Sequence, residues 1–358
     1  MIPYGRQTID DDDVAAVVAV LRGSHLTTGP AVDAFEAGLT AVTGARHAVA
    51  FANGTAALHA AAAAGGLGPG DRVGVPALTF AASANAARYV GATPVLLDVD
   101  PATLNLDPAA APAGLDALVA VHYAGLPVDL AALAHRPRLV VEDAAHALGA
   151  ATPDGPVGSC AHSDMCCFSF HPVKPITTAE GGAVTTNDDE LAARLRRFRS
   201  HGLVRRPEEG GWYQVTVEEG FNYRLTDLQA ALGTSQLAKL DRFRTARHAQ
   251  AERYREALAD LPLDLPPAPP LGWRHGHHLF AVRVDDRRRA YDRLHAAGVG
   301  VQVHYVPLHH HPWFAAAERH GDLAAVDAAY ERLLSLPLHP SLSETDQETV
   351  IDTLRSLW

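Results

Sequence analysis

Residues 165–185 read MCCFSFHPVKPITTAEGGAVT, and the interpretation of the chain starts from this stretch. A predicted strand, Met165–Phe170, leads to Lys174, which stands between Pro172 and Pro175. A lysine beside apolar residues usually extends its amine to solvent. Here the residues around Lys174 carry no charge, so we expect desolvation to lower the pKa of its amine. A lysine in that state is suited to Schiff-base chemistry.

Short apolar runs alternate with helix-length segments on both sides of this stretch. Segments such as 55–64 and 83–89 have the length of helices. The other six predicted strands are His47–Ala52, Arg72–Val75, Pro94–Asp98, Ala117–His122, Arg138–Glu142 and Gly182–Thr185. This alternation predicts an α/β fold with a mostly parallel seven-stranded sheet and helices on both of its faces.

The C-terminal part has a different pattern. A helical stretch is expected from Thr226 to about Leu261, where the proline-rich segment 261–270 ends it. Further elements are expected as strands at His278–Val284 and Val299–His304 and helices near Arg287–Ala297, Leu323–Leu334 and Glu344–Leu357. We therefore predict a large domain over 12–240 and a smaller α+β domain formed by an N-terminal arm, 1–11, with 241–358.

Composition excludes several classes of protein. The formal charge of −11 over 358 residues argues against general binding of nucleic acid or anionic membranes, so a phosphate-bearing ligand needs a local site. The first residues lack the basic and apolar stretches typical of a signal peptide, so we expect none, and no apolar run reaches membrane-spanning length. The three cysteines lack disulfide or zinc spacing, which indicates the cytoplasm. For the run His309–His311 we favour a solvated loop over a metal site, since no carboxylate-rich ligand set accompanies it.

A possible anion site lies in the stretch FANGTAAL at 51–58. A predicted strand runs into Asn53, Gly54 and Thr55, and an alanine-rich helix follows. The free amides and the dipole of a helix N-terminus favour an anion, and a glycine allows close approach of a phosphate. The alternative is a plain capped helix with Thr55 as its cap. Ser169, five residues before Lys174, is a further candidate for hydrogen bonding to a phosphate.

An acidic pair follows another buried strand, in LVVEDAAH at 139–146. Asp143 at such a position is suited to keeping a pyridine nitrogen protonated, which makes the ring an electron sink. The alternative is a carboxylate that caps the next helix.

Taken together, these segments resemble a known family. FSFHPVKPITTAEGGAVTTND, VEDAAHALGA, NGTAALH and GFNYRLTDLQAALG are similar to the DegT/DnrJ/EryC1/StrS sugar aminotransferases, and the similarity extends from IPYGRQTID near the start to VHYVPLH at 303–309. The resemblance implies fold type I of the pyridoxal-phosphate (PLP) enzymes, as in aspartate aminotransferase. It also implies PLP as cofactor and a homodimer with composite sites.

The resemblance assigns a role to each matching residue. Lys174 would carry PLP as a Schiff base and act as the catalytic residue, Asp143 would pair with the ring nitrogen, and Phe80 would stack on the ring. His146 would lie beside the ring hydroxyl, where many relatives carry Gln. The phosphate would be bound at Gly54 by Thr55, the Ala56 amide and Ser169, and by Asn222 of the partner subunit. Thr28, Tyr305 and His309 would face the substrate, and Glu180 would lie near the sugar without an assigned role.

The predicted reaction moves the amino group of glutamate to carbon 4 of a nucleotide-linked 4-keto-6-deoxy-sugar, as in the pseudaminic acid type of relative. Alternatives are amination of a carbon-3 keto-sugar or of a keto-cyclitol. A PLP-dependent sugar dehydratase is disfavoured, because such relatives carry His where this chain has Lys174. A PLP-binding regulator would need a DNA-binding segment, against which the acidic charge argues. Most of the arginines in 194–206 fit a solvated helix face, and one or two are candidates for binding a nucleotide diphosphate.

Overall fold

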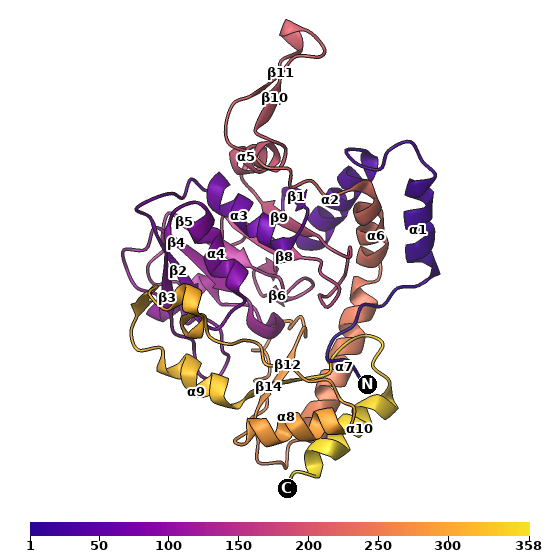
Figure 1. The fold of residues 1–358 in the computed structure, drawn as a ribbon, viewed down its shortest axis with the longest axis vertical. Helices are drawn as coiled ribbons and strands as arrows, with labels where there is room; N and C mark the ends of the chain where they lie inside the picture. Colours follow the sequence, from indigo (N-terminus) through magenta and orange to yellow (C-terminus); the bar gives the residue numbers. More distant parts are fainter.

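The seven predicted strands lie in one sheet in a computed structural model that describes residues 1–358 (Figure 1). The sheet order is β1-β9-β8-β5-β4-β2-β3-β13, and all strands run parallel except β9, which is antiparallel to β1 and β8. The strands are β1 (His47–Phe51), β2 (Arg72–Pro76), β3 (Thr93–Leu97), β4 (Ala117–Val121), β5 (Leu139–Asp143), β8 (Met165–Ser169), β9 (Gly182–Thr186) and β13 (Glu318–His320). The α/β class and fold type I are confirmed, and each predicted strand differs from the observed one by at most one residue at either end.

Helices cover both faces of this sheet, and the alternation of side chains along each strand explains why. On β1, Val49 and Phe51 belong to the core that includes α3, while Ala48 and Ala50 belong to the core on the other side, with α2. The helices of this part are α1 (Asp11–Leu21), α2 (Pro30–Thr43), α3 (Gly54–Ala64), α4 (Ala81–Tyr89), α5 (Asp189–Arg199) and α6 (Asp227–Leu237). Two short strands, β6 (Ala151–Thr152) and β7 (Gly155–Pro156), form a separate pair.

The single long helix expected after Thr226 is wrong. The chain forms α6 and then α7 (Leu240–Ala257), with a break at Ala238 and Lys239. The Lys239 amine contacts the carboxylates of Asp10 and, at 2.9 Å, Asp13. These pairs join the break to the start of α1, a long-range contact that helical periodicity does not report.

A third apolar core lies among the C-terminal elements. It contains Tyr254 of α7, Phe280 of β12 and Val350 of α10, all essentially inaccessible to solvent. The elements are β12 (Phe280–Arg283), α8 (Arg287–Ala296), α9 (Ala324–Arg332), β14 (Leu333–Leu336) and α10 (Glu344–Arg355), and β12 pairs antiparallel with β14.

Two predictions in this region are wrong. Val299–His304 is not a strand, because it makes only isolated bridges, through Val299 to Ile2 and Gln302 to Ser335. The predicted helix Leu323–Leu334 ends at Arg332, since the fully buried residues that follow pair with β12 as β14 instead.

Two further elements carry no strong sequence signal. The exposed three-residue strand β13 extends the large sheet by pairing with β3, and Glu318 forms an ion pair with Arg72 of β2. The hairpin of β10 (Leu203–Arg205) and β11 (Gln214–Thr216) projects from the body of the molecule, and Trp212 near its tip is 84% exposed (Figure 1). None of the helices combines the length and the apolar character needed to cross a membrane.

Candidate active site

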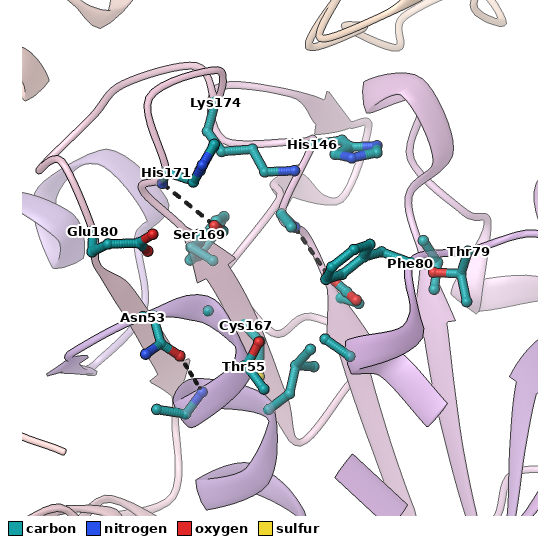
Figure 2. A pocket seen from close by; sticks show the side chains of 18 of the residues that line it. Asn53, Thr55, Thr79, Phe80, His146, Cys167, Ser169, His171, Lys174 and Glu180 are labelled. Atoms are coloured by element: carbon teal, nitrogen blue, oxygen red, sulfur yellow. Dashed lines mark hydrogen bonds between the residues drawn. The ribbon is translucent and has the colours of Figure 1, made fainter. Parts of the chain in front are cut away.

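A cavity of about 940 Å³ opens where β5 and β8 end and α3 begins. Its position outside the carboxyl ends of parallel strands is the usual ligand site of open α/β sheets. Nine of the predicted site residues line it: Gly54, Thr55, Ala56, Phe80, Asp143, His146, Ser169, Lys174 and Tyr305 (Figure 2).

Lys174 lies in a tight turn after β8, where its amide donates to the carbonyl of His171 at 2.8 Å. Burial lowers the pKa of the Lys174 amine to about 8, and the nearby charge of Asp143 opposes part of this shift. The amine is therefore far more often unprotonated near neutral pH than that of a solvated lysine. The only other lysine of the chain is Lys239, which is occupied by its ion pairs at the start of α1.

Asp143 is the last residue of the fully buried strand β5. Its Oδ2 accepts from the Ser83 hydroxyl at 2.7 Å, and Ser83 in turn lies 2.8 Å from the Thr79 hydroxyl. No helix follows Asp143, because residues 145–149 form turns, but its Oδ1 accepts from the Ala145 amide at 3.2 Å and so caps the start of these turns. Ser83 and Thr79 were not predicted from the sequence. A signal for Ser83 was available, because it lies three residues after Phe80, a predicted site residue. This spacing places both at the N-terminal end of α4.

The start of α3 differs from its prediction. The cap is Asn53 and not Thr55, because the helix begins at Gly54. The Ala56 amide donates to Asn53 Oδ1 at 2.8 Å and is already engaged, so it is less suited to the phosphate than expected. The amides of Gly54 and Thr55, the first two of the helix, have no intrahelical acceptor and are the better candidates.

The start of this helix packs closely against the end of β8. A Cβ atom placed on Gly54 would lie 2.8 Å from the Cβ and 3.2 Å from the Oγ of Ser169. Any side chain at Gly54 would therefore push apart the two groups that are predicted to hold the phosphate.

His146 is buried beside Tyr305, and its Nε2 lies 3.0 Å from the Tyr305 hydroxyl. Its ring also contacts His278, with 4.3 Å between centroids. Burial, followed by the charge of Lys174, holds the pKa of His146 well below its usual range, so the ring is neutral. The Nδ1 atom of His146 is buried without a hydrogen-bond partner, an uncommon state that a ligand group would relieve.

Phe80 and Glu180 lie at the rim of the cavity. Phe80 is 59% exposed, and its ring centroid lies 6.0 Å from that of Tyr305, which leaves one face free for stacking. Glu180 is exposed, and Figure 2 shows its side chain directed toward the cavity. Its backbone carbonyl is held by the Gln229 side chain at 2.7 Å.

Three predicted site residues do not line the cavity of this chain. Asn222 is exposed between β11 and α6, which leaves it accessible to a partner subunit. Thr28 is exposed, and its hydroxyl donates to the Thr27 carbonyl at 2.7 Å. His309 is directed away from the cavity, with Nε2 at 2.9 Å from Asp327. The roles of all three remain predictions.

An aromatic wall that the sequence analysis did not identify extends the cavity beyond the start of α3. It comprises His59, Tyr89, Phe221 and Tyr223. The rings of Phe221 and Tyr223 stack at 4.9 Å, and His59 Nδ1 lies 3.2 Å from the Tyr223 hydroxyl. Phe221 and Tyr223 belong to the GFNYR segment, so the signal was present. No arginine lines the cavity, and Lys174 is its only lysine.

The lining fits PLP at each chemically distinct part of the cofactor. Lys174 offers an amine for the aldehyde, Asp143 a carboxylate for the ring nitrogen, and His146 Nδ1 an unpaired atom for the ring hydroxyl. The free amides of Gly54 and Thr55 at the start of α3, with Ser169 beside them, offer donors for the phosphate at a helix N-terminus. When bound, the protonated pyridine ring withdraws electrons from the carbon next to the transferred nitrogen.

Comparisons with known proteins agree with this geometry. The model of the DegT/DnrJ/EryC1/StrS aminotransferase family matches residues 7–355. The spore coat polysaccharide biosynthesis protein SpsC of Bacillus subtilis (strain 168) is 36% identical over 378 residues, covering 99% of this chain and 97% of that protein. The structure of Helicobacter pylori PseC, an aminotransferase involved in the biosynthesis of pseudoaminic acid, is 28% identical, with a TM-score of 0.92 and coverage of 99% and 98%. That of S. venezuelae DesV is 36% identical, with a TM-score of 0.88 and coverage of 96% and 94%.

Proposed function

Because the chain belongs to the DegT/DnrJ/EryC1/StrS aminotransferase family and is a PLP-dependent sugar aminotransferase, we propose that it moves the amino group of glutamate to carbon 4 of a nucleotide-linked 4-keto-6-deoxy-sugar. The proposed reaction is of the UDP-4-amino-4,6-dideoxy-N-acetyl-β-L-altrosamine transaminase type. The observation that carries the reaction type is the pairing, in one cavity, of a desolvated lysine with a buried carboxylate at a strand end.

Lys174 has two tasks in this proposal. It anchors the cofactor, and its freed amine takes the proton from the α-carbon of glutamate. In the second half of the reaction the same amine delivers a proton to the sugar carbon that receives nitrogen. A positioned base of this kind contributes roughly 10²–10⁴-fold to the rate. Glutamate leaves as 2-oxoglutarate, and the sugar ketone becomes an amine.

Asp143, His146 and Ser169 hold groups in place and do not touch the sugar. Asp143, fixed by the hydroxyl of Ser83, keeps a proton on the ring nitrogen. His146, neutral and held by Tyr305, directs Nδ1 to the ring hydroxyl. Ser169 and the first amides of α3 hold the phosphate and so fix the position of the ring.

The negative substrates need positive charge that the cavity of one chain does not supply. Arg194, Arg197 and Arg199 are paired with acidic side chains of their own chain. Arg205 and Arg206 on the projecting hairpin are exposed and have no acidic partner. We therefore propose a homodimer in which the hairpin and Asn222 of each subunit complete the site of the other. A guanidinium matches a diphosphate well, so the hairpin arginines are the proposed nucleotide contacts.

Two features support carbon 4 as the position of amination. Pro175 directly after Lys174, and His146 in place of the glutamine of many carbon-3 relatives, resemble the pseudaminic type of enzyme. PseC matches this chain over its whole length. A carbon-3 keto-sugar or a keto-cyclitol is the second candidate. We propose the cytoplasm as the compartment, in accord with three free, buried cysteines.

The test of the reaction is the structure of its product. The enzyme is incubated with L-glutamate and either UDP- or TDP-4-keto-6-deoxy-hexose, and the product is analysed by NMR. We expect an amine at carbon 4 and one 2-oxoglutarate for each aminosugar. An amine at carbon 3, or turnover of a keto-inositol alone, overturns the substrate proposal and leaves the reaction type intact.

The test of the anchor uses the scarcity of lysine in this chain. Borohydride reduction after incubation with PLP should add one reduced cofactor to the peptide containing Lys174 and none to that containing Lys239. Lys174→Ala should abolish both the adduct and transamination, whereas Lys239→Ala serves as the matched control for the adduct. An adduct on Lys239 in the native enzyme, or full transamination by Lys174→Ala, would show that the anchor is misassigned.

A further inference from the structure

The run His309–His311, for which the sequence favours a solvated loop, lies in a different setting in the folded chain. A 3-10 turn, η5 (Leu308–His310), packs beside α9, and α9 supplies a carboxylate. The Nε2 atoms of His309 and His310 both lie 2.9 Å from Oδ1 of Asp327. We propose that His309, His310 and Asp327 form a binding site for a divalent transition-metal ion of the Zn²⁺ type.

The ligand atoms are close to the arrangement that such an ion needs. All three lie within 4.8 Å of one another. Zn²⁺ binds imidazole nitrogen at about 2.0–2.1 Å and carboxylate oxygen at about 2.0–2.2 Å, so neighbouring ligands of a tetrahedral site are about 3.3 Å apart. The two 2.9 Å separations need to widen by only a few tenths of an ångström. Two imidazoles and one carboxylate form a donor set that zinc, nickel and copper accept.

Exposure at the site suits an ion that exchanges with solvent. The side chain of His309 is 4% exposed and provides a fixed ligand, while those of His310 and Asp327 are 37% and 45% exposed. An ion can therefore enter from solvent, and water can complete its coordination. In the empty site His309 Nε2 donates to Asp327, and Nδ1 is buried without a partner, so the ring proton must move from Nε2 to Nδ1 before Nε2 can bind the ion.

One neighbour opposes a cation. The charge of Arg319 acts on His309, although the guanidinium donates to the Ala315 carbonyl at 3.3 Å. The positive charge of Arg319 is delocalised over its guanidinium and weakens cation binding at the site. It does not prevent binding, because the carboxylate of Asp327 lies directly between the two imidazoles.

The place of the site in the fold gives the ion a structural role. His309 follows the segment whose His304 and Tyr305 line the active-site cavity. The N-terminus of α9 is held by Asp98, whose carboxylate accepts from the amides of Ala325 and Val326 at 3.0 and 2.9 Å. An ion bound by η5 and α9 would join this segment to a helix that is anchored on the main sheet. It would thus stabilise the wall of the active site without contacting substrate.

The experiment uses tag-free holoenzyme that has been treated with a chelator and dialysed. Zn²⁺ is titrated by calorimetry, thermal unfolding is followed with and without Zn²⁺, and Co²⁺ serves as an optical probe of ligand geometry. The variants are His310→Gln and Asp327→Asn, whose side chains are 37% and 45% exposed. The matched control is His311→Gln, because His311 lies beside the cluster but directs its Nε2 to the Val306 carbonyl.

We expect one Zn²⁺ per chain, a higher midpoint of thermal unfolding and a visible Co²⁺ spectrum in the native enzyme and in His311→Gln. Both variants should lose at least tenfold in Zn²⁺ affinity and lose the thermal shift. Equal binding in native enzyme and variants would assign the ion to other histidines and overturn the proposal. Absence of binding in the native enzyme would also overturn it, and would leave Asp327 as a hydrogen-bond bridge between two imidazoles.

Discussion

Replacing Gly54 by alanine tests the proposed phosphate site most directly. The added Cβ would lie 2.8 Å from the Cβ, 3.2 Å from the Oγ and 3.3 Å from the Cα of Ser169. Carbon atoms in contact prefer about 3.5–4.0 Å, so the start of α3 and the end of β8 must separate by roughly 0.7–1.2 Å. The strand end cannot easily move, because Ser169 is paired with Gly182 of β9. The helix start must therefore shift away from the Ser169 hydroxyl.

The cost of this separation can be estimated from the behaviour of overpacked sites. Inserting a methyl group into a packed position costs about 1–3 kcal/mol. If the shift moves the amides of α3 and the Ser169 hydroxyl out of hydrogen-bonding position, most of that cost appears as weaker binding of PLP. The dissociation constant for PLP should then rise roughly 5- to 150-fold. The backbone of Gly54 is not strained, since its φ is not in the left-handed region, so no conformational penalty is added.

The assay compares two ligands on apoprotein. PLP and pyridoxal, which lacks the phosphate, are titrated against native protein and Gly54→Ala by absorbance. The control is Gly68→Ala beyond the other end of α3, where an added Cβ meets only the Val90 carbonyl at 4.0 Å. We expect Gly54→Ala to lose affinity for PLP and to keep its weak affinity for pyridoxal. Unchanged PLP binding, or an equal loss for both ligands, would refute the assignment of the phosphate to the start of α3 and Ser169.

Four further predictions concern the same site. Asp143→Asn should retain PLP on Lys174 but slow turnover by about 10²–10³-fold, because the ring nitrogen loses its proton; stopped-flow rates like those of the native enzyme would refute this role. The pKa of Lys174 near 8 predicts that PLP attaches to apoprotein faster as pH rises to about 8 and no faster above it, since only the unprotonated amine reacts; a rate that climbs until pH 10 would contradict the lowered pKa. Mixing inactive Lys174→Ala with inactive Asn222→Ala should restore about one quarter of native activity, because half of the dimers are mixed and each mixed dimer has one intact site; no recovery after subunit exchange, or a fully active monomer by light scattering, would rule out composite sites. Tyr305→Phe leaves His146 Nε2 buried without a partner, which costs about 1–3 kcal/mol; it should lower the unfolding midpoint and shift the pH at which the absorbance of bound PLP changes, and identical curves would exclude the proposed support of His146.

Seven strands of the main sheet were predictable because each is a largely buried run of five residues with a clear end, whereas the exposed β13 was not. Lys174 and Asp143 were singled out for the same reason, since Asp143 ends one such run and Lys174 lies in the turn after another. The division into 12–240 and 1–11 with 241–358 remains a proposal, and β13 complicates it, because this strand lies in the C-terminal segment but pairs with β3 of the main sheet.

Contacts between distant segments account for what the sequence did not indicate. Ser83 and Asp143 are sixty residues apart and meet only because α4 begins and β5 ends at the same edge of the sheet. The break at Lys239 depends on Asp10 and Asp13 at the other end of the chain, and neither residue alters the local helical pattern.

The histidine run shows how such contacts change a functional interpretation. In the sequence, His309 and His310 lack an acidic ligand close by, and a solvated loop is the simpler reading. Asp327 comes to them only because α9 folds back onto η5, and Asp98 of the main sheet holds the start of α9. The same physical reason applies to the active site, where Gly54 and Ser169 come into contact only after α3 and β8 are packed together. Residue types at strand ends thus predict which chemistry is available, whereas the packing of helices on the sheet decides which of those residues act together.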